Sequence, residues 1–138
     1  MNVEFKSFTD ARKGLKDALD VASEGGVATI SRSHSGRAAV VDAQQLRRTL
    51  ATLLDLNPQL VADGPAEWAM FLPGYPISGT GATPEEAVTD TVDALREYAD
   101  DWQERLQQAP NHRDNWGLVQ LVSLSSSDEL ERWLNGSA

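Results

Sequence analysis

The sequence predicts an α+β protein made of two small domains, each combining a short sheet with packed helices. Strand and helix periodicities alternate through residues 1–56. The pair Asn57-Pro58 then interrupts the helical pattern. Beyond it, short apolar segments surround a long amphipathic helix. We therefore predict two domains, at residues 1–56 and 57–138.

In the first domain we expect a strand at residues 1–5, followed by an amphipathic helix. Asp10, or Thr9 beside it, is positioned to cap the first helical turn. Gly25-Gly26 ends the helix where a left-handed residue is needed. The helix carries a single apolar stripe, made of Ala11, Leu15, Ala18, Leu19 and Ala22.

The rest of the first domain is predicted to be a hairpin and a second helix. Residues 27–31 and 38–41 are apolar strands joined by the polar turn at residues 32–37. Asp42 and Gln45 have the spacing of a capping box. The inner residues of the helix are expected to be Ala43, Leu46, Leu50, Leu53 and Leu54.

The second domain is predicted to hold a small sheet and a long acidic helix. Thr83 and Pro84 fit the cap and the first position of this helix, which continues to about Gln108. We expect Ser126 or Ser127 to cap a short helix at the end. The predicted strands are residues 60–62, 67–72 and 116–122, residues 77–81 are a short strand or a bulge, and the final helix is residues 128–134.

The charge is unevenly distributed along the chain. The net charge is −9 over 138 residues, but residues 1–50 carry eight basic and six acidic residues, a net +2. Residues 51–138 carry four basic and fifteen acidic residues, a net −11. This asymmetry predicts two partners, a polyanion for the first half and a basic protein for the second.

Other features of the composition exclude whole classes of site. Cysteine is absent, so disulfides and thiolate metal sites are excluded. There is no signal peptide and no apolar run long enough to cross a membrane, so we expect a cytoplasmic protein without a membrane partner.

Basic side chains cluster around the first helix and the hairpin turn. Phosphate bound there would meet positive side chains and the free amides of a helix start. The alternative is that these residues only keep the surface soluble. The candidate DNA-binding residues are Arg12, Lys13, Lys16, Arg32 and Arg37.

Four short segments of the first half occur in a characteristic order. They are Phe8-Thr9-Asp10-Ala11-Arg12, Glu24-Gly25-Gly26, Ile30-Ser31-Arg32-Ser33 and Arg37-Ala38-Ala39-Val40-Val41. In this order they resemble the Phd/YefM family of antitoxins. The resemblance implies a small α/β domain that dimerises and binds operator DNA, so we expect a homodimer or a higher even oligomer.

The second half carries a second set of segments. They are Phe71-Leu72-Pro73-Gly74, Gly79-Thr80-Gly81, Thr83-Pro84-Glu85-Glu86-Ala87 and Ala94-Leu95-Arg96-Glu97-Tyr98. They look like a HicB-type antitoxin core, a partial ribonuclease-H-like fold of a sheet backed by one helix, which binds a toxin. Only about 14 residues follow this core, so a DNA-binding element would have to precede it.

Together the two resemblances imply an antitoxin of a type II toxin–antitoxin system. It would neutralise a small basic toxin, expected to be a ribonuclease, and repress its own operon. The alternative is a protein-interaction module that dimerises without touching DNA. The expected toxin-binding residues are Trp102, Trp116, Trp133, Asp100 and Asp101. For Trp133, packing back on the sheet is the competing interpretation.

We expect no enzymatic activity, no cofactor and no metal. Ribonuclease-H-like chemistry needs carboxylates converging from strands and helices, whereas the candidate acids here lie along one helix. His34 and His112 lie in separate predicted loops with no nucleophile motif around either.

Overall fold

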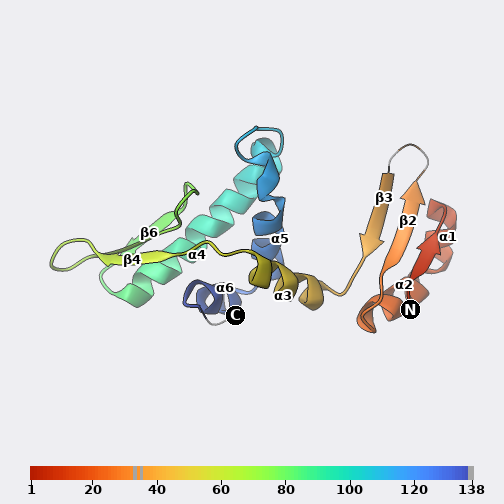
Figure 1. The fold of residues 1–138 in the computed structure, drawn as a ribbon, viewed down its shortest axis with the longest axis horizontal. Helices are drawn as coiled ribbons and strands as arrows, with labels where there is room; N and C mark the ends of the chain where they lie inside the picture. Colours follow the sequence, from red (N-terminus) through yellow and green to blue (C-terminus); the bar gives the residue numbers. More distant parts are fainter. Residues whose placement is uncertain (33, 35, 137–138) are drawn as a thin grey trace. The chain divides into compact units, whose positions relative to one another are not determined.

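The computed structural model describes residues 1–32, 34 and 36–136, and this part of the protein is a mixed α+β fold (Figure 1). It holds two three-stranded sheets, with the strand orders β1-β2-β3 and β4-β5-β6. The chain divides into two compact units, Met1–Leu46 and Arg47–Ala138. The sequence places its boundary later, at Asn57, so most of the helix before that residue belongs to the second unit.

The first unit is a parallel β-α-β arrangement extended by a hairpin. Its elements are β1 (Val3–Phe5), α1 (Phe8–Lys13), α2 (Leu15–Ser23), β2 (Ala28–Arg32) and β3 (Gly36–Val40). β1 is parallel to β2, and β2 is antiparallel to β3. Both helices pack against β2. The predicted strands and hairpin are therefore confirmed, with shifts of one or two residues at their ends.

The predicted single helix is two helices, and its predicted cap is wrong. The hydroxyl of Ser7 accepts a hydrogen bond from the amide of Asp10 at 3.1 Å, so Ser7 caps α1 rather than Asp10 or Thr9. The break falls at Gly14, where a Cβ atom would overlap the ring of Phe5. Close packing of the helix turn on β1 therefore requires glycine there.

The buried stripe on these helices is narrower than predicted. Ala11, Ala18 and Ala22 are buried, while Leu15 and Leu19 are more than half exposed. Small residues let the helices approach the sheet, and the two leucines lie at the outer border of the stripe.

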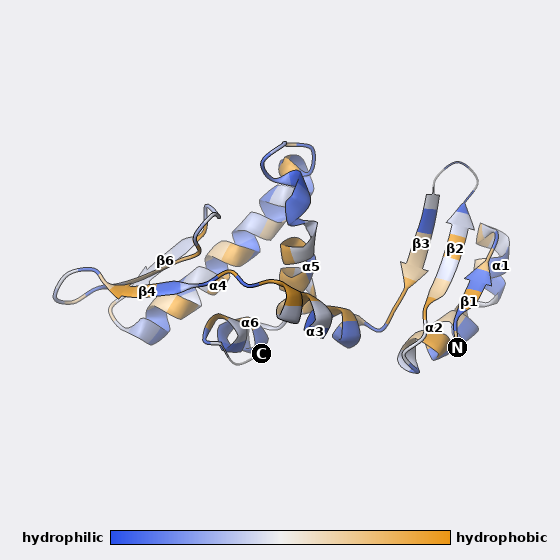
Figure 2. Ribbon diagram, in the orientation of Figure 1, coloured by the Kyte–Doolittle hydropathy of each residue, from blue (hydrophilic) through white to orange (hydrophobic). Residues whose placement is uncertain are grey.

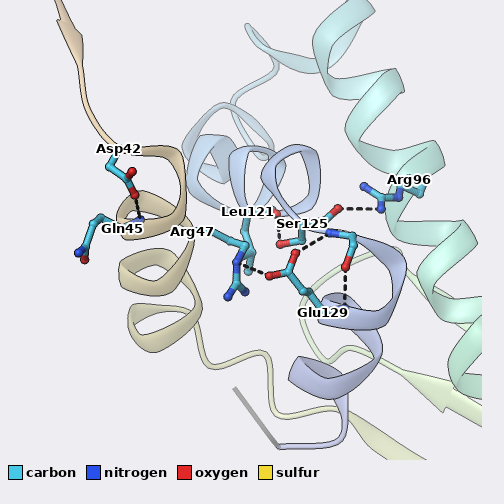
Figure 3. Close-up of polar contacts among 8 residues, drawn as sticks. Asp42, Gln45, Arg47, Arg96, Leu121, Ser125 and Glu129 are labelled. Carbon is cyan, nitrogen blue, oxygen red and sulfur yellow. Dashed lines mark hydrogen bonds and ion pairs between the residues drawn. The ribbon is translucent and has the colours of Figure 1, made fainter. Parts of the chain in front are cut away.

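The capping of the next helix, α3 (Ala43–Leu53), is confirmed. A carboxylate oxygen of Asp42 accepts from the amide of Gln45 at 2.9 Å (Figure 3). The buried face of the helix is different from the predicted one. Arg47 and Ala51 are buried with Leu50, whereas Leu53 is 74% exposed.

After α3, the second unit continues with an antiparallel meander of β4 (Gln59–Ala62), β5 (Trp68–Phe71) and β6 (Ser78–Gly81). The long helix α4 (Pro84–Asp101) packs against β5 and β6. Figure 2 shows hydrophobic and hydrophilic residues alternating around α4, as the predicted amphipathic helix requires.

The start of α4 is fixed by predicted signals and by glycine in β6. The hydroxyl of Thr83 accepts from the amide of Glu86, with Pro84 at the first helical position. Gly79 faces Thr91 of α4 so closely that any Cβ atom would overlap it. The absence of a side chain there lets the helix lie directly on the strand.

After α4 the chain continues through a π-helical turn, η1 (Trp102–Leu106), and a short 3₁₀ turn, η2 (Arg113–Asn115). Two helices follow, α5 (Trp116–Leu124) and α6 (Ser127–Leu134). The predicted strand at residues 116–122 is therefore wrong. Its apolar residues are instead buried on one side of a helix. A short apolar run occurs in buried strands and in buried helices, so it does not distinguish a strand from a helix.

The final helix is confirmed together with its cap. Ser126 and Glu129 form a complete capping box, in which each side chain accepts from the backbone amide of the other residue. The core of the second unit collects residues from Leu56 to Leu134, with Leu72, Leu95, Leu118 and Leu130 among the most deeply buried.

Candidate functional site

All five candidate DNA-binding residues have exposed side chains, and the topology of the first unit places the hairpin arginines at the end of the sheet where α1 begins. Phe5 pairs with Ile30, so β1 and β2 finish at the same end of the sheet. The chain leaves β1 there to form α1, and it leaves β2 there to form the hairpin (Figure 1). Arg12 and Lys13 end α1, and Lys16 opens α2, while Arg32 and Arg37 flank the hairpin turn.

The first unit as a whole is electrically balanced, although its charges are partly segregated. Residues 1–46 carry six basic and six acidic residues, because the arginines at 47 and 48 belong to the second unit. Arg32 and Arg37 flank the hairpin turn at one end of the sheet. Arg12, Lys13 and Lys16 lie on the helices, where Asp10, Asp17 and Asp20 alternate with them. The hairpin end is therefore basic, while the charges along the helices are mixed.

One of the candidate cations already has a partner within the chain. The ammonium group of Lys16 lies 2.7 Å from a carboxylate oxygen of Asp20, one helical turn along α2. The hydrogen bond to Asp20 and its negative charge raise the pKa of Lys16 above the usual value for lysine. Phosphate would have to compete with this carboxylate for Lys16.

The tryptophans expected to face a toxin differ in exposure. Trp102 is buried, and its indole N–H donates to the carbonyl of His112 at 2.8 Å. Trp133 is partly buried against the core and donates to the carbonyl of Ala51 at 3.3 Å. Trp116 is 51% exposed at the start of α5. Of the three, Trp116 offers the largest contact surface.

The two aspartates of the expected toxin surface lie side by side in the sequence at the end of α4. Asp100 is exposed, and Asp101 makes an ion pair at 3.5 Å with Arg105 in the π-helical turn. Asp101 also lines an open pocket of about 420 Å³, together with Glu97, Tyr98 and His112. This end of α4 therefore combines negative charge with a concave surface.

Sequence reasoning missed two side-chain networks in the second unit. Arg47 is 8% exposed and pairs with Glu129 of the same chain (Figure 3). The hydroxyl of Tyr98 hydrogen-bonds to Nδ1 of His112 and accepts from the side-chain amide Nδ2 of Asn115, each at 2.8 Å. Neither network has a spacing signal, because each joins residues from different elements.

Within residues 1–32, 34 and 36–136, no group of three or more His, Asp or Glu side chains is arranged to hold a metal ion. In the same part of the chain, no helix has the length and apolarity needed to cross a membrane.

No family model matches this sequence, and no curated protein matches it significantly. A solved structure does share its fold. That protein, from Syntrophomonas wolfei subsp. wolfei, is described as the antitoxin part of a proposed toxin/antitoxin system. The two chains are 18% identical, and the match covers 96% of this chain and 95% of the other with a TM-score of 0.75. The protein therefore has the fold of that antitoxin along nearly its whole length.

Proposed function

We propose that this protein is an antitoxin that neutralises a cognate toxin by binding it directly. The observation that carries the proposal is the fold shared with a protein described as an antitoxin, over nearly the full length of both chains. In this proposal the chain has no enzymatic role, because its task is to cover the active surface of another protein.

The toxin-binding part is proposed to be the HicB-like domain of residues 57–138. The helix α3 packs against this domain and stabilises it. The charge of this half favours a basic partner. Residues 47–138 carry six basic and fifteen acidic residues. A ribonuclease toxin must be positively charged to hold RNA, so the two surfaces would attract each other. Asp100, Asp101 and Trp116 are the proposed contacts, while Trp102 and Trp133 stabilise the fold behind them.

The DNA-binding part is proposed to be the Phd/YefM-like first domain, acting as a homodimer or a higher even oligomer on operator DNA. The exposure of the basic side chains supports this role, and the residues concerned are Arg12, Lys13, Lys16, Arg32 and Arg37. Phosphate contacts would supply affinity and register but no sequence information. Repression of its own operon would follow from binding upstream of its gene.

A second candidate function is a dimerising interaction module that does not contact DNA. The observation in its favour is the balanced charge of residues 1–46 and the pairing of Lys16 with Asp20. DNA binding usually depends on a strong electrostatic attraction. A unit with a net charge of zero provides this attraction only if its basic side chains gather on one surface.

Two assays on the full chain test the proposal. Co-expression with the protein encoded by the adjacent gene should relieve growth arrest caused by that protein, and the two should co-purify as a stable complex. A gel shift with the upstream region of the gene should give a retarded band. Growth arrest that persists under co-expression contradicts the antitoxin role. A missing gel shift with intact neutralisation favours the module without DNA contact.

A further inference from the structure

The sheet of the second unit has two edges, and only one of them is protected among the residues that the structure describes. At the β6 edge, the amide of Thr80 donates to the carboxylate of Asp90 at 2.8 Å. Just beyond β6, the amide of Ala82 donates to the carboxylate of Glu86 at 2.8 Å. Both acceptors come from α4, which also packs closely on β6. Proteins commonly block edge strands in such ways, because an open edge pairs with other chains.

The β4 edge has no such protection within the described ranges of the chain. The amide of Asp63 donates to the carbonyl of Glu67 at 2.7 Å, which makes these two residues a hydrogen-bonded pair. Such pairs alternate along an antiparallel ladder, and the register pairs Val61 with Ala69. Leu60 and Ala62 therefore direct their N–H and C=O groups away from β5, toward the open edge.

The side chains around this edge are apolar and exposed. Leu60 is 39% exposed, and Val61 and Phe71 are each 43% exposed. Leu60 lies beyond the part of the sheet that α4 covers, since α4 packs on β5 and β6. Val61 and Phe71 alternate with the buried Met70, so they lie on the opposite face of the sheet. The strand carries neither a proline nor a charged residue, the usual means of discouraging added strands.

The charge around the edge indicates what kind of chain it accepts. From residue 49 to residue 95 there is no lysine or arginine, while seven acidic residues occur in that stretch. Asp63 directly follows β4, and with Glu67 it lines an open hollow of about 480 Å³ at that end of the sheet. A second copy of this unit would bring like charges together. A basic segment would instead be attracted.

We propose that the β4 edge accepts an extended, basic segment of the protein partner as a fourth strand of the sheet. Backbone hydrogen bonds to Leu60 and Ala62 would give affinity, and side chains alternating along the added strand would pack on Val61 and Phe71. Lysines or arginines of the segment would lie near Asp63 and Glu67. Only one part of this inference rests on the proposed function, namely that the protein partner is a toxin.

The test uses the full chain and a synthetic peptide of alternating valine and lysine, with blocked ends, as the probe. Amide hydrogen exchange is followed by NMR as the peptide is added. The amides of Leu60 and Ala62 should exchange about tenfold more slowly at saturation, because they become hydrogen-bonded. The same peptide with N-methylated backbone amides should give no protection, and a valine–glutamate peptide should bind much more weakly.

Variants locate the binding edge. Leu60→Pro removes an outward N–H, which an edge strand tolerates, and should abolish peptide binding. Leu60→Lys keeps the N–H and should weaken binding through charge repulsion, so it covers the case in which the proline variant fails to fold. Leu53→Lys is the matched control, since it makes the same change at an exposed leucine of α3 and should leave binding unaltered.

Three results would overturn the inference: no protection at Leu60 and Ala62, equal binding of the glutamate peptide, or self-association of the chain through β4. These are separable from failure of the proposed function. An antitoxin that binds its toxin elsewhere would still relieve growth arrest when Leu60 is changed to lysine. A chain with no antitoxin role would still bind the valine–lysine peptide.

Discussion

Arg47 and Glu129 form an ion pair that joins α3 to α6, with 2.9 Å between Nε and the carboxylate oxygen. Glu129 also accepts the amide of Ser126 in the capping box of α6, and Arg96 donates to the carbonyl of Ser125 just before it (Figure 3). One carboxylate therefore fixes both the start of α6 and its contact with α3. The last turns of α3 are in this way part of the second unit.

Replacing Arg47 with alanine should destabilise the second unit by about 3 kcal/mol, because the carboxylate of Glu129 would lose the positive charge beside it in a largely buried place. Arg48→Ala, at the exposed neighbouring position, should change stability by less than about 0.5 kcal/mol. Urea unfolding followed by tryptophan fluorescence measures both. Equal stability of the two variants would contradict a structural role for the pair.

The sequence predicts most elements correctly because their signals are local. The Asp42 and Thr83 caps, the Gly25-Gly26 stop and the amphipathic pattern of α4 each lie within a few residues of the structure that they specify. The run at residues 116–122 resembles a strand because its burial comes from contacts with distant elements. A helix buried over much of its surface loses the periodicity that would identify it.

The two parts of the candidate site also differ in how much of each can be predicted from the sequence. The basic residues of the first unit are recognisable from composition and from the order of the elements. The burial of Arg47 is not, because it depends on where α6 lies in space. The open β4 edge is also invisible in the sequence, because it results from α4 covering mainly β5 and β6.

Two glycines of the second unit should respond in opposite directions to replacement by alanine. Gly79→Ala should destabilise the unit by about 1–3 kcal/mol, because the new methyl group meets Thr91 and the backbone of α4. Gly117→Ala should stabilise it by a few tenths to about 1 kcal/mol, because alanine favours the helix. Its Cβ would make only an ordinary contact, 3.6 Å from Leu50. Thermal unfolding of the two variants checks the signs, and a stabilised Gly79→Ala would contradict the close approach of α4 to β6.

Replacing Tyr98 with phenylalanine should cost about 1–3 kcal/mol, because the hydroxyl joins His112 and Asn115 in a partly buried network. Tyr75→Phe is the control, since its hydroxyl makes no hydrogen bond within residues 1–32, 34 and 36–136 and it should be nearly neutral. The denaturant concentration at the midpoint of unfolding, measured for each variant, gives the comparison. A neutral Tyr98→Phe would show that water replaces the hydroxyl without cost.

The basic residues of the first unit can be tested through the salt dependence of DNA binding. Changing Arg12 and Lys16 to alanine should weaken binding to the upstream region. The slope of log K against log salt should fall by about one for every phosphate that a protomer no longer binds. The effect of Lys16 should be the smaller, because Lys16 is already paired with Asp20.

Arg48→Ala removes an exposed cation outside the first unit, so it is the control and should retain the slope. Toxin neutralisation should be unchanged when Arg12 and Lys16 are replaced, since both lie outside the second unit. A slope that is the same for the double variant and the parent would place the DNA-binding surface elsewhere on the chain.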